Sequence, residues 1–228
     1  MALILQIETS TISCSVALSQ DGQTISFKEA VERNIHASSI TLFIEEVMKA
    51  ANKKLADLDA VAVSMGPGSY TGLRIGVSTA KGLCYGLDVP LIAIDTLQAM
   101  ASSKRINPGD GDLLYCPMID ARRMEVYSAM FDAKLDIRNS VAANIIDEHS
   151  FSTALEKHKI VFFGDGADKC IAALGNHPNA TFITGFINSA VDMNALAHTK
   201  FGAQQFEDLA YFEPYYLKDF VATTPKAL

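Results

Sequence analysis

The two halves of this chain open with the same pattern, and that repeat is the feature that most constrains its fold. Residues 3–8 form an apolar run that ends at Glu8, and a short polar link leads to a return run. Residues 113–119 form another apolar run, which ends at Asp120 and is followed by a tight polar link and a return run. Buried strands that pair through short links are therefore predicted twice. The repeat predicts two related lobes.

The first half also contains helices, which are predicted from the spacing of apolar residues. Apolar side chains recur at helical intervals along residues 35–51, and a second helix is predicted at residues 69–85. Buried strands are predicted at residues 60–65 and 91–95, and a short helix follows from Thr96. The order of three strands and then alternating helices and strands is typical of a mixed sheet covered by helices.

The second half has fewer and shorter predicted elements. They are a strand near residues 160–164 and helices near residues 167–174 and 193–203. The polar, turn-rich residues 104–112 are the best linker candidate. We therefore predict an N-terminal lobe at residues 1–103 and a reduced C-terminal lobe at residues 104–228, whose tail packs back on the first lobe.

Composition narrows the function classes. The net charge is −7, and no cluster of Lys and Arg provides the basic face that a chain binding RNA alone needs. Hydrophobic residues make up 49% of the chain and the mean hydropathy is +0.17, which favours a protein that buries surface against a partner. No apolar run approaches the roughly 18 residues of a membrane helix, and the opening MALILQIE is predicted to be a strand rather than a signal peptide.

The four cysteines also bear on the compartment. Neither a CxxC motif nor a small secreted framework is present, and three of the four cysteines lie in apolar runs. Reduced, buried thiols in a cytosolic protein are therefore expected. The cysteines are Cys14, Cys84, Cys116 and Cys170.

A glycine-rich turn, GPGSYTG at residues 66–72, joins a predicted strand to the second helix. It matches neither the dinucleotide fingerprint nor a P-loop, although a helix N-terminus can still hold an anion. The alternative is a turn that lets the chain reverse closely into the helix. Beyond it, Gly72, Gly76 and Ala80 leave one helical face nearly without side chains. That face either packs inside its own lobe or contacts another subunit.

Glu8 and Asp120 are the candidate cleft residues, because both lie at matched strand ends. Two such carboxylates can hold Mg²⁺ with a nucleotide phosphate, but acidic residues at strand ends are also common in loops. The five histidines contain no H-E-x-x-H pattern, which disfavours a zinc hydrolase.

Five stretches resemble the bacterial TsaB (YeaZ) family, in the same order and over nearly the whole chain. The most specific is VSMGPGSYTGLRIGVSTAKGL, and the others are LILQIETSTISCSVAL, PLIAIDTLQAM, PMIDARRMEVYSAMF and EPYYLKDF. The resemblance implies the actin/hexokinase/Hsp70-like ATPase fold. It also implies a role in making N6-threonylcarbamoyladenosine (t6A) in tRNAs that read codons beginning with adenine. In this family's pathway the related enzyme TsaD transfers the threonylcarbamoyl group, and the P-loop ATPase TsaE assists.

The resemblance also shows what this chain lacks. Where the catalytic relative carries two metal-binding histidines, this chain has Thr96 and Met100, which cannot replace two imidazoles on a metal. The second lobe's link after Asp120 reads Ala-Arg-Arg-Met, whose side chains obstruct a phosphate that glycines would admit. We therefore expect a non-catalytic homologue with no cofactor of its own, a degenerate cleft at Glu8 and Asp120, and ATP and metal held by TsaD and TsaE.

The resemblance further implies that the helices at residues 35–51 and 69–85 contact TsaD, or a second copy in a homodimer. We expect tRNA to bind only through the complex, in the cytoplasm and without a membrane. Periodicity does not settle which side chains point outward. The candidate interface residues are Phe43, Val47, Leu73, Gly76, Val77 and Ala80. Two alternatives are an autonomous ATP-dependent phosphotransferase that uses Glu8 and Asp120, and a metallopeptidase-like protein.

Overall fold

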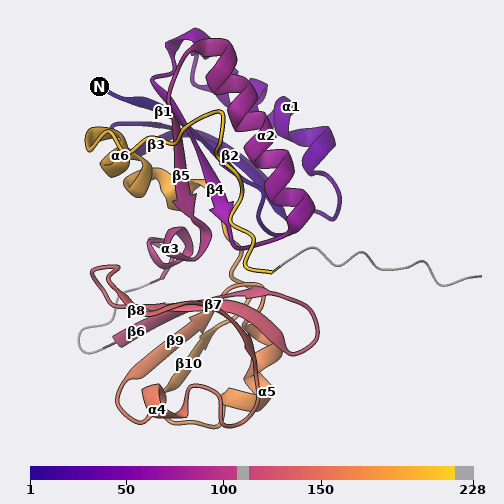
Figure 1. Ribbon diagram of the computed structural model, residues 1–228, viewed down its shortest axis with the longest axis vertical. Coiled ribbons are helices and arrows are strands. Elements are labelled where there is room, and N and C mark those ends of the chain that lie inside the picture. Colours follow the sequence, from indigo (N-terminus) through magenta and orange to yellow (C-terminus); the bar gives the residue numbers. More distant parts are fainter. Residues whose placement is uncertain (107–112, 219–228) are drawn as a thin grey trace, which may run out of the picture.

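The computed structural model describes residues 1–106 and 113–218, and their strands form two five-stranded sheets. The first sheet contains β1 (Leu3–Glu8), β2 (Ser13–Gln20), β3 (Gln23–Val31), β4 (Ala60–Gly66) and β5 (Leu91–Asp95). The second contains β6 (Leu113–Asp120), β7 (Glu125–Phe131), β8 (Ile137–Ile145), β9 (Lys159–Phe163) and β10 (Ala180–Ile183). Each sheet is the centre of one lobe, and Figure 1 shows the first lobe above the second.

Both sheets have the same topology, so the predicted repeat is confirmed. The first sheet has the order β3-β2-β1-β4-β5 and the second the order β8-β7-β6-β9-β10. In each, three consecutive strands pair antiparallel and the last two add in parallel. The strands β8 and β10 escaped prediction because β8 is an exposed edge strand and β10 has only four residues. The reduction of the second lobe therefore lies in its helices.

Two long helices cover one face of the first sheet. They are α1 (His36–Ala50) and α2 (Tyr70–Leu87), with the short helix η1 (Leu55–Asp57) between them in sequence. Leu5 and Ile7 of β1 point to this face and are fully buried with Val47 and Val77 of the two helices. The neighbouring residue Ile4 points the other way, so β1 is buried on both faces.

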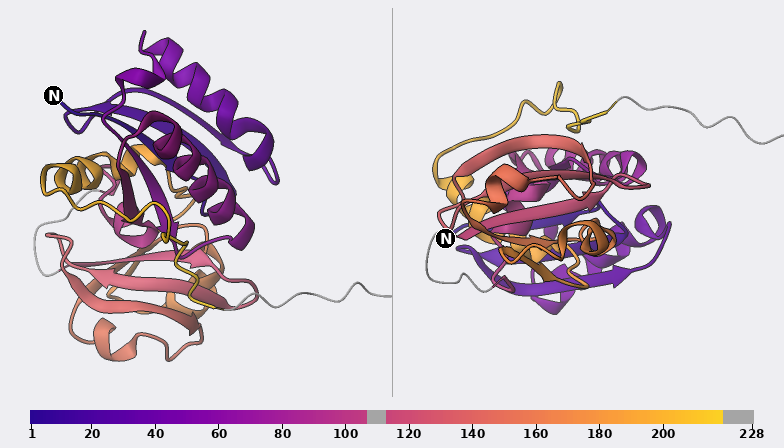
Figure 2. Two further views of the ribbon diagram at one scale, coloured as in Figure 1. Left: turned by 45° about the horizontal axis from the view of Figure 1, so that its top comes forward. Right: turned by 90° about the horizontal axis from the view of Figure 1, so that it is seen from below.

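The opposite face of the first sheet is covered by residues that follow the second sheet in the chain. These are η3 (Ala190–Met193) and α6 (Asn194–Gly202), whose Met193 and Ala197 are buried against Ile4 and Ile94. Figure 2 shows α6 on the far side of the sheet from α1 and α2. The first lobe is therefore completed by a late segment of the chain.

The helix α3 (Thr96–Ala101) connects the lobes. Its Leu97 and Met100 are buried against Tyr115 and Phe163 of the second sheet. The predicted boundary between residues 103 and 104 falls in the connection after α3, and residues 107–112 of the predicted linker lie outside the described part of the chain.

The helices of the second lobe are short. They are α4 (Ser152–Leu155), η2 (Asp168–Cys170) and α5 (Ile171–Leu174). Among the helices of residues 1–106 and 113–218, none has the length and apolar character to cross a membrane. The four cysteines are buried and unpaired, and burial raises the pKa of Cys14 and Cys84 to about 11.

Candidate functional site

The glycine-rich turn is packed against the turn between β1 and β2. The Ser69 amide donates to the Ser10 carbonyl oxygen at 2.6 Å, and the Ser69 side chain caps α2. A Cβ atom added to Gly68 would lie 2.4 Å from the Ser10 carbonyl oxygen, and one added to Gly72 would lie 2.1 Å from that of Thr9. The small residues therefore permit close packing within the lobe.

The bare face of α2 is covered by the same lobe. A Cβ atom added to Gly76 would lie 2.2 Å from the Thr9 hydroxyl oxygen, and that hydroxyl donates to the Gly72 carbonyl oxygen at 2.8 Å. Ala80 is fully buried in the core of the lobe. Of the two alternatives for this face, the structure supports packing inside the lobe.

The prediction that six residues present a contact surface therefore needs correction. All of them are buried by their own lobe, because the face of α1 and α2 that carries them lies on the first sheet. They are Phe43, Val47, Leu73, Gly76, Val77 and Ala80. A surface that these helices offer to a partner must come from their other faces.

Such a surface exists as a groove between α1 and α2, with a volume of about 660 Å³. We call it the α1–α2 groove. Ile44, Met48 and Leu83 provide apolar atoms to its lining, while exposed polar side chains such as Thr41 and Lys49 stand at its rim. The complete lining is Thr41, Ile44, Glu45, Met48, Lys49, Asn52, Lys53, Lys54, Leu55, Thr79 and Leu83. Sequence periodicity found the two helices but assigned the contact to their buried faces.

Glu8 lies in a buried polar cluster rather than on an open surface. Its side chain is 1% exposed, and its Oε1 accepts from the Ser10 amide at 2.6 Å and from the Ser64 hydroxyl at 2.9 Å. Asn188 covers this cluster from the segment after β10 and donates to the Ser10 hydroxyl at 2.9 Å. Burial raises the pKa of the Glu8 carboxyl, and the hydrogen bonds from Ser10 and Ser64 oppose that rise.

Asp120 lies at the end of β6 with a separate set of partners. Its carboxylate is paired with Lys169 and accepts from the Arg122 amide at 2.9 Å. Its own amide donates to the carboxylate of Asp165 at 3.0 Å, and burial, with a contribution from Asp120, raises the pKa of Asp165 to about 6. Among the contacts of the described residues, Glu8 and Asp120 share no partner.

The two positions that replace histidines serve packing and hydrogen bonding. The Thr96 hydroxyl accepts from the Gly66 amide at 3.2 Å, and Met100 is buried at the contact between the lobes. Within residues 1–106 and 113–218, no group of three or more His, Cys, Asp or Glu side chains is placed to hold a metal ion.

Several residues that shape these sites were not found from the sequence. Asn188, Asp165, Lys169 and Lys218 come from distant parts of the chain, and only Lys218 lies in one of the stretches that resemble the family. The only available signal was the Gly164-Asp165-Gly166 stretch directly after β9, since glycines that flank an acid at a strand end often mark a tight turn.

The repeated sheet, with a second lobe of the same strand order joined through α3, defines the two-lobed fold of the actin, hexokinase and Hsp70 class. Comparisons with known proteins identify the family. A family model for TsaD, tRNA N6-adenosine threonylcarbamoyltransferase, matches residues 29–220. The tRNA threonylcarbamoyladenosine biosynthesis protein TsaB of Bacillus subtilis is 30% identical over 162 residues, which are 70% of this chain and 69% of that protein. The chain belongs to the TsaB (YeaZ) family.

Two further comparisons agree with this assignment. TsaB of Escherichia coli is 38% identical over 128 residues, and this match spans 56% of the chain and 54% of the relative, about half of each. The solved structure of YeaZ from Pseudomonas aeruginosa superposes with a TM-score of 0.77 at 25% identity, covering 95% of this chain and 100% of that one.

The fold class implies a nucleotide with a metal ion between the lobes, and the candidate residues do not fit these groups. The Glu8 carboxylate is buried and occupied by Ser10 and Ser64, so it cannot reach a ligand without breaking those bonds. Asp120 is already paired with Lys169. We therefore derive no chemical step through a nucleotide or a metal in this chain.

Proposed function

We propose that this protein is a non-catalytic subunit required for t6A formation in tRNAs that read codons beginning with adenine. It acts by binding and positioning the TsaD transferase, together with TsaE. The relatives named TsaB support the pathway. The α1–α2 groove is the observation that carries the mode of action, because it is the exposed surface between the two helices that the family resemblance assigns to subunit contact.

The composition of the groove suits a protein partner. Its apolar lining residues are surrounded by charged side chains, as in interfaces that bury an apolar centre within a polar rim. Glu45, Lys49 and Lys53 belong to the lining, so the groove offers both signs of charge. Leu42 of α1 and Tyr85 of α2 are also exposed.

The burial of Glu8 supports the absence of catalysis in this subunit. A catalytic carboxylate must reach its substrate, and this one is enclosed by Ser10, Ser64 and Asn188. We assign ATP and metal to TsaD and TsaE, and tRNA to the assembled complex. A net charge of −7 gives the isolated chain little electrostatic attraction for tRNA. The place of action is the cytoplasm, where such a complex meets its tRNA.

The same surface also supports self-association. A symmetric dimer uses one patch on each copy, so a pair of chains joined through their α1–α2 grooves would hide the surface that TsaD needs. Dimerisation and TsaD binding are therefore expected to compete.

The experiment is co-purification with TsaD and TsaE, followed by mass measurement of the complex. Thr41→Arg places a long charged side chain at the exposed rim of the groove, whereas Ala50→Arg adds the same side chain to an exposed position of α1 outside its lining. We expect Thr41→Arg to lose the complex and Ala50→Arg to retain it, with similar melting temperatures. Equal binding by both variants would exclude this groove, and no complex with the unmodified chain would reject the proposed function.

A further inference from the structure

We propose that a strip of basic side chains along the edge that joins the two lobes contacts the phosphate backbone of the RNA substrate in the complex. The strip is formed by Arg74, Arg122, Arg123, Lys169 and Lys218. The proposal rests on the proposed function, and it names the surface through which this subunit would touch the RNA.

The strip is centred on the β6–β7 turn, residues 121–124. Arg122 and Arg123 both adopt left-handed backbone conformations, with φ values of 73° and 50°. Positive φ values are conformations that glycine and asparagine adopt more readily than other residues, and that arginine adopts only at a cost. Both arginines are exposed. The stability of the turn therefore does not explain why arginine occupies these two positions. A contact that the guanidinium groups make outside the turn does explain it.

The acidic residues beside the turn are already paired with lysines from elsewhere in the chain. Asp120 is paired with Lys169, which also donates to the Glu125 carbonyl oxygen at 2.7 Å. Glu125 is paired with Lys218 at 2.5 Å. These pairs leave the guanidinium groups of Arg122 and Arg123 without a hydrogen bond or an ion pair to any residue of the described part of the chain.

The charges around the turn sum to a positive value. The turn and its immediate partners contain four cations, Arg122, Arg123, Lys169 and Lys218, and three carboxylates, those of Asp120, Glu125 and Asp165. Of the three carboxylates, the first two are paired and the third is half-buried and accepts a backbone hydrogen bond. The excess charge is carried by the two arginines, which are the exposed groups. Their planar guanidinium groups suit phosphate, which they can bind through two hydrogen bonds at once.

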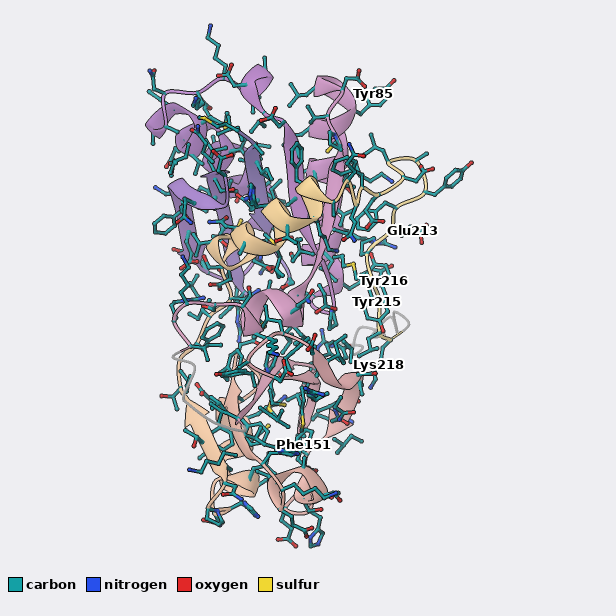
Figure 3. The ribbon with its side chains drawn as sticks, turned by 90° about the vertical axis from the view of Figure 1, so that its left-hand side faces the viewer. Tyr85, Phe151, Glu213, Tyr215, Tyr216 and Lys218 are labelled. Atoms are coloured by element: carbon teal, nitrogen blue, oxygen red, sulfur yellow. The ribbon has the colours of Figure 1, made fainter. Side chains whose placement is uncertain are left out.

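The C-terminal segment extends the strip onto the first lobe. Figure 3 shows Glu213, Tyr215, Tyr216 and Lys218 following one another from the first lobe towards the second. The Arg74 guanidinium lies 4.2 Å from the ring centre of Tyr70, and its Nε donates to the Tyr216 hydroxyl at 3.1 Å. Lys218 is only two residues beyond Tyr216, which is about 7 Å of extended chain.

Arg74 therefore continues the strip and adds aromatic rings beside it. The rings of Tyr70 and Tyr216 lie 4.8 Å apart around an exposed guanidinium. Aromatic rings and arginines beside a basic track are typical of surfaces that bind unpaired nucleotides. In a chain whose net charge is −7, a local excess of positive charge on one edge favours a polyanion over a neutral partner.

The test uses the complex of this chain with TsaD and TsaE, and an unmodified tRNA transcript that carries adenosine 3′ to its anticodon. The double variant Arg122→Asn/Arg123→Gly removes both guanidinium groups and places at these positions residues that tolerate positive φ values. The control, Lys134→Gln/Lys157→Gln, removes two charges from exposed positions of the second lobe outside the strip. Fluorescence anisotropy across a salt series measures the affinity, and mass measurement confirms assembly.

We expect the turn variant to melt at or above the temperature of the unmodified chain, to assemble normally and to bind the tRNA on the order of tenfold more weakly. Its plot of log affinity against log salt should be shallower by about 1.4 to 1.8, which corresponds to two lost phosphate contacts. The control should match the unmodified chain. Unchanged affinity and slope in an intact complex would overturn the inference while leaving the proposed function in place. Loss of assembly with unchanged affinity for RNA would instead assign the strip to an acidic protein surface.

Discussion

Replacing Gly76 with alanine should destabilise the first lobe, although alanine is the better helix former. The new Cβ atom would lie 2.2 Å from the Thr9 hydroxyl oxygen, a separation that forces one of the two residues to move. Thr9 is fully buried, and its hydroxyl is bonded to the Gly72 carbonyl oxygen at 2.8 Å. Movement of either residue therefore breaks packing between α2 and the β1–β2 turn.

The magnitude follows from three contributions. Overpacking in a core costs about 1–3 kcal/mol, and loss of the Thr9 hydrogen bond costs about 1 kcal/mol. Replacing a helical glycine by alanine returns about 1 kcal/mol. The free energy of unfolding should therefore fall by about 2 kcal/mol, which for a chain of this size lowers the melting temperature by roughly 4–8 °C.

The assay is thermal unfolding followed by circular dichroism, with Gly82→Ala as the matched control. Gly82 lies on the same helix, is exposed, and has no atom within 4 Å of an added Cβ. This control should melt about 2–4 °C higher than the unmodified chain. Thr9→Ala should partly rescue Gly76→Ala, because it removes the atom that the new methyl group meets. If Gly76→Ala melted as high as Gly82→Ala, the packing argument for this helix face would be refuted.

Three further predictions concern ionisable groups. Burial raises the pKa of Asp165 from 3.8 to about 6, so the folded protein binds its proton more tightly, and stability should rise as the pH falls from 7 towards 4. Asp165→Asn should remove that dependence and add about 1–3 kcal/mol at pH 7.5 in denaturant titrations; an unchanged pH profile would contradict this. Glu8→Gln should leave the yield of t6A in the reconstituted reaction unchanged, whereas loss of product from a variant that still folds and assembles would place Glu8 in the chemistry. Arg74→Ala should leave the melting temperature nearly unchanged but speed hydrogen exchange at the Tyr215 amide, which donates to the Met65 carbonyl oxygen at 2.7 Å; unchanged exchange would show that Arg74 does not hold this segment.

Much of the fold could be predicted because its signals are local. The mostly apolar run of β1 and the helical period of α1 both indicate burial by neighbouring layers, and the structure places β1 at residues 3–8 as expected. The strand β8 was not predicted, because an exposed edge strand carries neither an apolar run nor a strict alternation of apolar and polar residues. The contribution of α6 to the first lobe could not be predicted from its short, weakly patterned sequence.

The candidate site was predicted less well, for a physical reason. A helix that is apolar on two faces shows the same spacing of apolar residues whether a given face packs on its own sheet or contacts a partner. The sequence therefore could not show whether Gly76 faces the sheet or a partner. The enclosure of Glu8 depends on Asn188, which lies 180 residues further along the chain and carries no motif. The basic strip depends on Lys169 and Lys218 meeting the acids beside the β6–β7 turn, and such tertiary pairs leave no trace in local sequence.

We propose that this protein acts in t6A formation as a subunit and not as an enzyme. A titration tests it most directly: t6A formation is measured by mass spectrometry of digested tRNA, with TsaD and TsaE held constant and this chain added in increasing amounts. We expect no product without the chain, a rise in rate with each addition, and a sharp plateau at a fixed molar ratio to TsaD. Full rate at a small fraction of that ratio would mean that the chain turns over as a catalyst, which would exclude a purely structural role for this subunit.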